Sequence, residues 1–124
     1  MGDLTKNFNS SEFRCKCGGC EDSENKMDMD FLGSLQDARD VAGSPFNITS
    51  GYRCENHPES IKRPTSSHTI GTAVDIATPD SVSRYTVVRA LIRAGLSRIG
   101  IGKSFVHVDM DPNMPPNVMW DYYG

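Results

Sequence analysis

The chain has 124 residues, of which 37% are hydrophobic and 23% charged, with a formal net charge of −3 at pH 7. This length fits one compact domain over residues 1–124, and the composition is not that of a disordered protein. No stripe of Lys and Arg is available to follow a phosphate backbone, so we expect no nucleic acid partner. No apolar run approaches the roughly 18 residues that cross a bilayer, and residues 1–6 lack the apolar region of a signal peptide.

Two segments carry apolar residues at helical spacing. The first helix is expected to begin at Asp28 and to be ended by residues 43–45, Gly-Ser-Pro. Its apolar face comprises Met27, Phe31, Leu35, Ala38 and Val41 or Ala42. The second helix is expected to begin with a cap at Asp80 or Ser81, to run to residue 94 and to be ended by Gly95. Its expected inner face comprises Tyr85, Val88, Leu91 and Ile92.

Short strands are expected at residues 46–50, 72–77, 98–101 and 105–109, the last two joined in a tight hairpin. Three other segments read as irregular. They are the cysteine-containing entry segment at 1–25, a long loop at 53–67 and a tail at 111–124. Loops as long as 53–67 are commonly functional when they occur inside a compact domain. The order of helices and strands favours an α+β domain.

Two of the three histidines have acidic residues nearby in the sequence, which is unusual for histidines that are simply packed in a core. His68 ends the long loop, and Asp75 follows seven residues later in an otherwise apolar strand. His107 and Asp109 are two residues apart in a strand and therefore point to the same face. A carboxylate at a core position is costly unless a metal or hydrogen bonds stabilise it, and two imidazoles with one carboxylate are a common catalytic zinc set. From spacing alone, a structural acceptor role for the acid and a packed role for the strand histidine stay open.

Three motifs occur in order along the chain. Residues 50–53 read S-G-Y-R, residues 66–75 read S-S-H-T-I-G-T-A-V-D, and residues 100–109 read G-I-G-K-S-F-V-H-V-D. Together they resemble the motifs of the zinc D-alanyl-D-alanine carboxypeptidase superfamily, which also contains phage L-alanyl-D-glutamate endolysins and the signalling domain of Hedgehog proteins. Trp120 falls where a closing Trp is common in that family. The resemblance implies a Hedgehog/DD-peptidase-like fold, with a small antiparallel sheet and helices packed on one side.

The resemblance also implies a role for each matching residue. His68, Asp75 and His107 would hold a catalytic zinc ion. Arg53 would bind substrate and stabilise the developing oxyanion, for which a fixed guanidinium is well suited. Ser66 would hydrogen-bond the substrate. Without the motifs, a surface salt bridge for Arg53 and a turn role for Ser66 would be the ordinary interpretations.

The catalytic base is the point at which the chain departs from the family. Many members carry an acid three residues before the last histidine ligand, whereas this chain has Ser104 there. Asp109 is the nearest acid, and we predict that it is the base, with the orientation of an imidazole as its alternative role. Asp111 and His57 are further candidates. The missing acid also keeps open a non-catalytic module that binds metal.

The four cysteines are expected to serve as scaffold rather than in catalysis. Cys15, Cys17 and Cys20 are close together, and Cys54 directly follows Arg53. A second, structural zinc ion, one or two disulfides, and free thiols in a reducing compartment are all compatible with this spacing. A zinc ion or disulfides that joined the entry segment to Cys54 would hold Arg53 rigidly in place.

We therefore expect a zinc metallopeptidase that cuts bacterial cell-wall peptide next to a D-amino acid. The bond is either the D-Ala-D-Ala terminus, for a carboxypeptidase, or an internal L-Ala-D-Glu bond, for an endopeptidase. The expected partner is the peptidoglycan stem peptide, and we expect a monomer without a membrane partner. A phage endolysin or a small accessory peptidase would be delivered to the periplasm or cell wall and would otherwise stay cytoplasmic until release. The alternatives are a non-catalytic zinc-binding module and a virion structural protein that keeps the fold.

Overall fold

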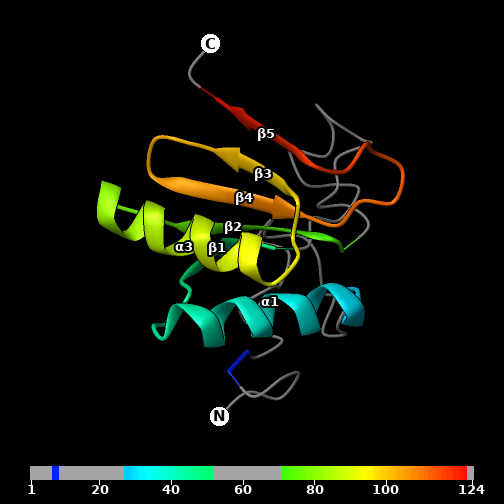
Figure 1. Ribbon diagram of the computed structural model, residues 1–124, viewed down its shortest axis with the longest axis horizontal. Coiled ribbons are helices and arrows are strands. Elements are labelled where there is room, and N and C mark those ends of the chain that lie inside the picture. The colour runs from blue at the N-terminus through cyan, green and yellow to red at the C-terminus, as the bar shows by residue number, and fades with distance from the viewer. Residues whose placement is uncertain (1–6, 9–26, 52–70, 123–124) are drawn as a thin grey trace, which may run out of the picture.

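The structure, a computed structural model, describes residues 7–8, 27–51 and 71–122. Within these residues the elements are, in order, α1 (Met29–Ala42), β1 (Ile48–Ser50), β2 (Ala73–Ala77), α3 (Ser81–Arg93), β3 (Arg98–Ile101), β4 (Phe105–Asp109) and β5 (Val118–Asp121). The described strands form one sheet in the order β1-β2-β4-β3-β5. Strands β3 and β5 run parallel, and the other neighbours run antiparallel. Helices α1 and α3 lie side by side against the sheet (Figure 1), which confirms the α+β class.

Both helices begin and end where the sequence predicts. The carboxylate of Asp28 accepts a hydrogen bond from the backbone N–H of Phe31 and caps α1, and Gly43 ends this helix with φ 68°. Asp80 caps α3 and forms a reciprocal pair of hydrogen bonds with Ser83. Such caps satisfy backbone N–H groups that have no partner inside the helix. No helix in the described part of the chain is long and apolar enough to cross a membrane.

The predicted inner face of α3 is partly wrong. Leu91 is buried, but Tyr85 and Ile92 are 69% and 54% exposed. Val87 and Ala90 are buried in their place. The two apolar stripes are neighbours on the helix surface and both have helical spacing, so periodicity alone does not separate them. The packed stripe is the one that faces α1 and β4, where a small residue such as Ala90 allows close approach.

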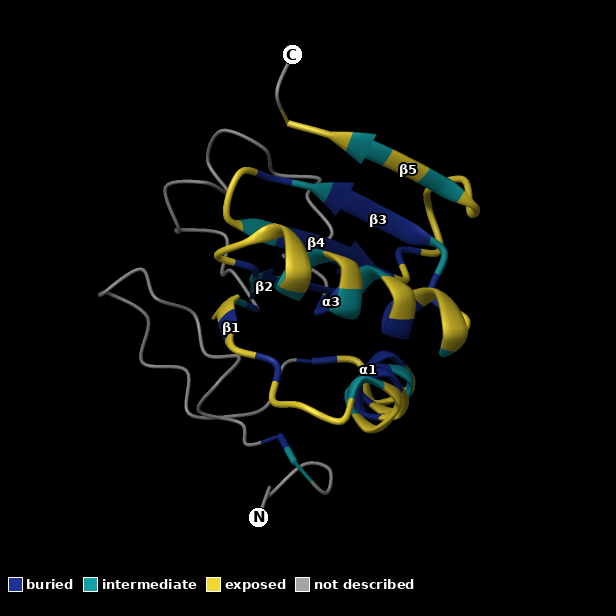
Figure 2. Cartoon of the chain, turned by 60° about the vertical axis from the view of Figure 1, so that its left-hand side comes forward, coloured by how far each residue is buried: buried dark blue, intermediate teal, exposed yellow. Residues whose placement is uncertain are grey.

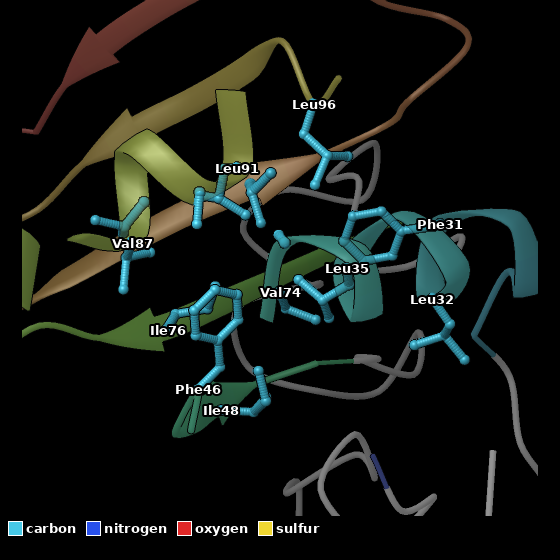
Figure 3. Close-up of a cluster of buried hydrophobic side chains, with 14 of the residues drawn as sticks. Phe31, Leu32, Leu35, Phe46, Ile48, Val74, Ile76, Val87, Leu91 and Leu96 are labelled. Carbon is cyan, nitrogen blue, oxygen red and sulfur yellow. The ribbon is translucent and has the colours of Figure 1, made fainter. Parts of the chain in front are cut away.

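The core lies between the helices and one face of the sheet. Figure 3 shows side chains from α1, α3 and the strands meeting in this space. The strand residues that enter the core are Ile48, Val74, Ile76, Ile99, Val106 and Val108. Because side chains alternate along a strand, the intervening residues point to the opposite face of the sheet. That second face carries Asp75, His107 and Asp109.

The strands agree with the prediction except at the C-terminal end. The hairpin formed by β3 and β4 has the predicted bounds, and β1 and β2 are slightly shorter than expected. The predicted irregular tail contains β5, which pairs with β3 so that Trp120 lies opposite Gly100. Strand β5 is short, and its sequence shows no alternation of apolar and polar residues. Two prolines precede it, which are typical of an irregular segment. Figure 2 shows β3 as a largely buried strand between β4 and β5.

Several predicted features lie outside the described residues. They include the long loop at 53–67, the four cysteines and nearly all of the entry segment. Of the entry segment, Asn7 and Phe8 are described, and Phe8 is part of the core. The backbone N–H of Asn7 donates to Gln36 on α1, at 2.8 Å. This part of the entry segment is therefore attached to the helical layer.

Replacement of Leu35 on α1 by alanine tests the core. Leu35 is fully buried, so Leu35→Ala should lower the free energy of unfolding by about 2–5 kcal/mol through lost burial and the cavity that remains. Val41 lies on the same helix but is 44% exposed, and Val41→Ala should change the free energy of unfolding by no more than about 0.5 kcal/mol. Urea unfolding followed by circular dichroism measures both values. Equal effects of the two substitutions would contradict the described packing of α1.

Candidate metal centre

The residues of the candidate site form a row across the sheet. Asp75 on β2 is paired with His107 on β4, which is paired with Gly100 on β3. Gly100 is in turn paired with Trp120 on β5. Directly paired residues on neighbouring strands point to the same face of a sheet. The register therefore brings an acid, a histidine and an aromatic ring together on the face opposite the helices.

The imidazole of His107 lies between two carboxylates. Its Nδ1 is 3.1 Å from Oδ1 of Asp75, and its Nε2 is 2.7 Å from Oδ2 of Asp109. The imidazole is also buried. Both ring nitrogens are thus engaged, and each faces a different acid. This arrangement fixes the rotation of the ring.

The spacing of Asp75 and His107 fits a shared zinc ion. Two ligand atoms at about 2.0–2.1 Å from a tetrahedral zinc lie about 3.3 Å from each other. The 3.1 Å between Oδ1 of Asp75 and Nδ1 of His107 is close to that value. In the part of the chain that the structure describes, no group of three or more His, Cys, Asp or Glu side chains converges on one point. Asp75 and His107 can therefore supply two ligands, and the third predicted ligand, His68, lies outside the described residues.

The electrostatics of the site depend on the same contacts. Burial disfavours the charged imidazolium, but the hydrogen bonds to Asp109 and Asp75 outweigh it and raise the pKa of His107 above its ordinary value. Burial also disfavours the carboxylate of Asp109, yet hydrogen bonds from His107, Asp111 and Arg98 hold the pKa of Asp109 below its usual range. A metal ion at Nδ1 has to displace a proton, so metal binding should weaken as the pH falls.

Asp109 is held on both oxygens. Its Oδ2 contacts His107, and its Oδ1 accepts a hydrogen bond from Nε of Arg98 at 2.6 Å and one from the backbone N–H of Asp111 at 3.1 Å. The residue is only 1% exposed. A general base needs an oxygen that reaches the attacking water, whereas an orienting residue needs an oxygen on the imidazole. The geometry meets the second requirement, and the base role of Asp109 stays a prediction.

The other predicted base candidates occupy different positions. Asp111 is buried, and its Oδ1 accepts a hydrogen bond from the backbone N–H of Asn113 at 2.9 Å. Ser104 lies exposed in the turn between β3 and β4, where its carbonyl accepts from the backbone N–H of Thr78. His57 lies outside the described residues, as do the predicted substrate-binding residues Arg53 and Ser66.

The two glycines of the G-x-G motif make room for aromatic rings. A Cβ atom on Gly100 would lie 2.6 Å from Nε1 of Trp120, and one on Gly102 would overlap the ring of Phe105. The Trp120 ring centroid is 5.6 Å from that of His107. The glycines thus allow the aromatic side chains of β4 and β5 to cover the same face of the sheet.

Gly71 begins the described segment that leads from the S-x-H-x-x-G motif into β2. Its φ of 74° is in the left-handed region, which favours glycine. Its carbonyl accepts a hydrogen bond from the backbone N–H of Asp28, at 2.8 Å. The next carbonyl, that of Thr72, accepts from the backbone N–H of Met110. These bonds fix the start of β2 against both the first helix and the end of β4.

Arg98 is the site residue that the sequence interpretation missed. It lies on β3 in register with Asp109, and its side chain is nearly buried. The structure pairs Ile101 with Val106 and therefore residue 98 with residue 109, whereas a turn of residues 102–104, as expected from the sequence, would pair residue 98 with residue 108. A charged residue at that end of a short, otherwise apolar strand marks a position that needs a partner.

Replacement of Gly100 by alanine tests the position of Trp120. The added methyl group should push the indole away from His107, lower the free energy of unfolding by about 1–3 kcal/mol and shift the fluorescence of the protein, because Trp120 is its only tryptophan. Gly33→Ala is the matched control. Gly33 lies within α1 with no atom near its Cβ position, so alanine should stabilise the helix by about 0.5–1 kcal/mol. An unchanged emission spectrum for Gly100→Ala would show that Trp120 does not cover this strand.

Comparison with known protein families places this chain beside a family of peptidases. The sequence model of the Peptidase M15 family matches residues 6–109, which include all three motifs and end on Asp109. The chain has no match among curated proteins. The match covers most of the chain and confirms the resemblance to the zinc D-alanyl-D-alanine carboxypeptidase superfamily. The chain belongs to the Peptidase M15 family.

Proposed function

We propose that this protein is a zinc-dependent peptidase that hydrolyses bacterial cell-wall peptide next to a D-amino acid. The observation that carries the proposal is the approach of Oδ1 of Asp75 to Nδ1 of His107, at the separation of two ligands of one zinc ion. Membership of the Peptidase M15 family supports the same chemistry. We propose His68 as the third ligand, from its place in the second motif.

In the proposed reaction, different residues of the chain bind the metal, bind the substrate and stabilise the developing charge. Asp75 and His107, with His68, hold the metal, which when bound acidifies a water molecule and polarises the scissile carbonyl. Arg53 binds the substrate and stabilises the negative charge that develops on the carbonyl oxygen. Ser66 donates to or accepts from the substrate peptide. The sheet supports this site because β2 and β4 are paired along five residues and are backed by the core.

We propose three candidate residues for the general base, which accepts a proton from the attacking water. Asp109, Asp111 and His57 are the candidates, and the contacts of Asp109 with His107 and Arg98 favour an orienting role for that residue. A metal-binding module without catalysis is the second candidate function. The observation that favours it is the exposed Ser104, which occupies the position where many relatives carry an acid.

The substrate is proposed as the stem peptide of peptidoglycan, bound by a monomer. Either the D-Ala-D-Ala terminus or the internal L-Ala-D-Glu bond is compatible with this proposal. The two reactions give different products, because a carboxypeptidase releases free D-alanine and an endopeptidase separates the stem peptide into fragments. The products therefore identify the bond.

Mass spectrometry of muropeptides after digestion tests the function. The zinc-loaded protein should release D-alanine or shortened stem peptides, and His68→Ala and Asp75→Ala should each lower the rate at least about 100-fold by removing a metal ligand. Removal of zinc with a chelator should abolish the activity, and added zinc should restore it. Asp37→Ala is the control, since Asp37 is an exposed acid on α1, which packs on the opposite face of the sheet from Asp75 and His107.

Each outcome of this experiment has a definite meaning. Cleavage that depends on zinc and on both predicted ligands supports the proposed peptidase. If the protein binds zinc but releases no product, the peptidase proposal fails and the non-catalytic module is favoured. If Asp75→Ala keeps full activity, the assignment of Asp75 as a ligand is wrong even if the protein is a peptidase.

A further inference from the structure

Arg98 connects three parts of the candidate site. Its Nε donates to Oδ1 of Asp109, and its Nη1 donates to the backbone carbonyl of Pro115. Its guanidinium carbon lies 5.2 Å from the centre of the Trp120 ring, at cation–π distance. The side chain thus joins the end of β4, the turn that follows it and strand β5.

These contacts determine which oxygen of Asp109 faces the imidazole. Oδ1 is held by Arg98 and by the backbone N–H of Asp111, so Oδ2 is the oxygen that remains for Nε2 of His107. A carboxylate in this position accepts the Nε2–H hydrogen bond, which leaves Nδ1 as the nitrogen with a lone pair. Nδ1 is the ring atom that faces Asp75.

We infer that Arg98 is a positioning residue for the metal centre, which acts through Asp109 to present Nδ1 of His107 to the ion. The inference rests on the proposed zinc site. None of these hydrogen bonds joins Arg98 to the ligands Asp75 and His107, so the hydrogen-bonded route from Arg98 to the metal passes through the Asp109 carboxylate.

The geometry requires arginine rather than any cation. Two nitrogens of one planar group donate in different directions, to a carboxylate and to a backbone carbonyl, while the face of the group lies over an indole ring. The ammonium of lysine is a point charge without a planar fork, and it cannot keep the same three contacts from a single position. Arg98→Lys should therefore keep the charge and lose part of the positioning.

The zinc dissociation constant, measured by chelator competition, tests this inference without reference to activity. Changes in groups that orient a metal ligand weaken metal binding about 10–100-fold. We expect Asp109→Asn to lie in this range, and Arg98→Met to weaken zinc binding about tenfold. Arg98→Lys should weaken zinc binding less than Arg98→Met does. It also provides the test of Arg98 if Arg98→Met does not fold. Arg93→Met is the matched control, because Arg93 is exposed at the end of α3, and it should leave the constant unchanged.

The double variant Arg98→Met/Asp109→Asn shows whether Arg98 and Asp109 affect zinc binding through the same contact or independently. If Arg98 acts through Asp109, the double variant should bind zinc about as tightly as Asp109→Asn alone. Long-range ¹H–¹⁵N spectra of the zinc-loaded protein give a second measurement. In the wild type, Nε2 of His107 should carry the proton and Nδ1 the metal. In Asp109→Asn, Arg98 and the Asp111 N–H should hold the amide oxygen and turn the amide NH₂ toward Nε2, which favours the opposite tautomer.

The outcomes distinguish this inference from the proposed function. If the wild type binds no zinc, the proposed function fails together with the inference. If the wild type binds zinc and the folded Arg98 variants bind it equally tightly, only the positioning role is overturned. Losses that multiply in the double variant would also overturn it, because Arg98 would then act by another route. If Asp109→Asn lowers only the catalytic rate and leaves the zinc constant unchanged, Asp109 acts in catalysis rather than on the zinc ligand, and Arg98 does not position the ligand through it.

Discussion

The imidazole of His107 is held from both sides by carboxylates, and the other features of the site follow from that constraint. Asp75 can reach Nδ1 because β2 and β4 pair residue 75 with residue 107. Asp109 can reach Nε2 because it is two residues further along the same strand and points to the same face. Arg98 on the next strand then neutralises the charge of Asp109, which would be costly to bury alone. The register of β2 against β4 and the alternation of side chains along β4 thus account for both carboxylate contacts of the ring.

The division of the sheet into two faces explains how a small chain can support such a charged site. The face toward α1 and α3 is filled by branched and aromatic side chains, so it supplies the stability that the strands need. The opposite face is then available for polar groups that must stay in fixed positions. Sites built on paired strands are more precise than sites built on loops, because the backbone hydrogen bonds fix each Cα atom. The glycine at position 100 completes the arrangement by leaving room for Trp120 beside His107.

Much of this fold could be predicted from the sequence, since the caps at Asp28 and Asp80 and the hairpin of residues 98–109 have strong local signals. The buried stripe of α3 could not, because two overlapping stripes have the same period and only tertiary packing selects between them. Strand β5 was missed because its pairing with β3 depends on contacts distant in sequence. Asp75 and His107 were found from their motifs, whereas the pairing of Arg98 with Asp109 depends on a hairpin register one residue different from the one that the expected turn of residues 102–104 implies. The predicted roles of Arg53, Ser66 and His68 concern residues outside the described part of the chain.

A crystal structure of the zinc-loaded protein, with anomalous data collected on both sides of the zinc absorption edge, tests the central claim most directly. The anomalous peak should lie within coordination distance of Oδ1 of Asp75 and Nδ1 of His107, and Nε2 of His107 should still be hydrogen-bonded to Asp109. A peak bound instead to Nε2 of His107, or located at the cysteines with none beside Asp75, would contradict the account of this face of the sheet as a metal centre.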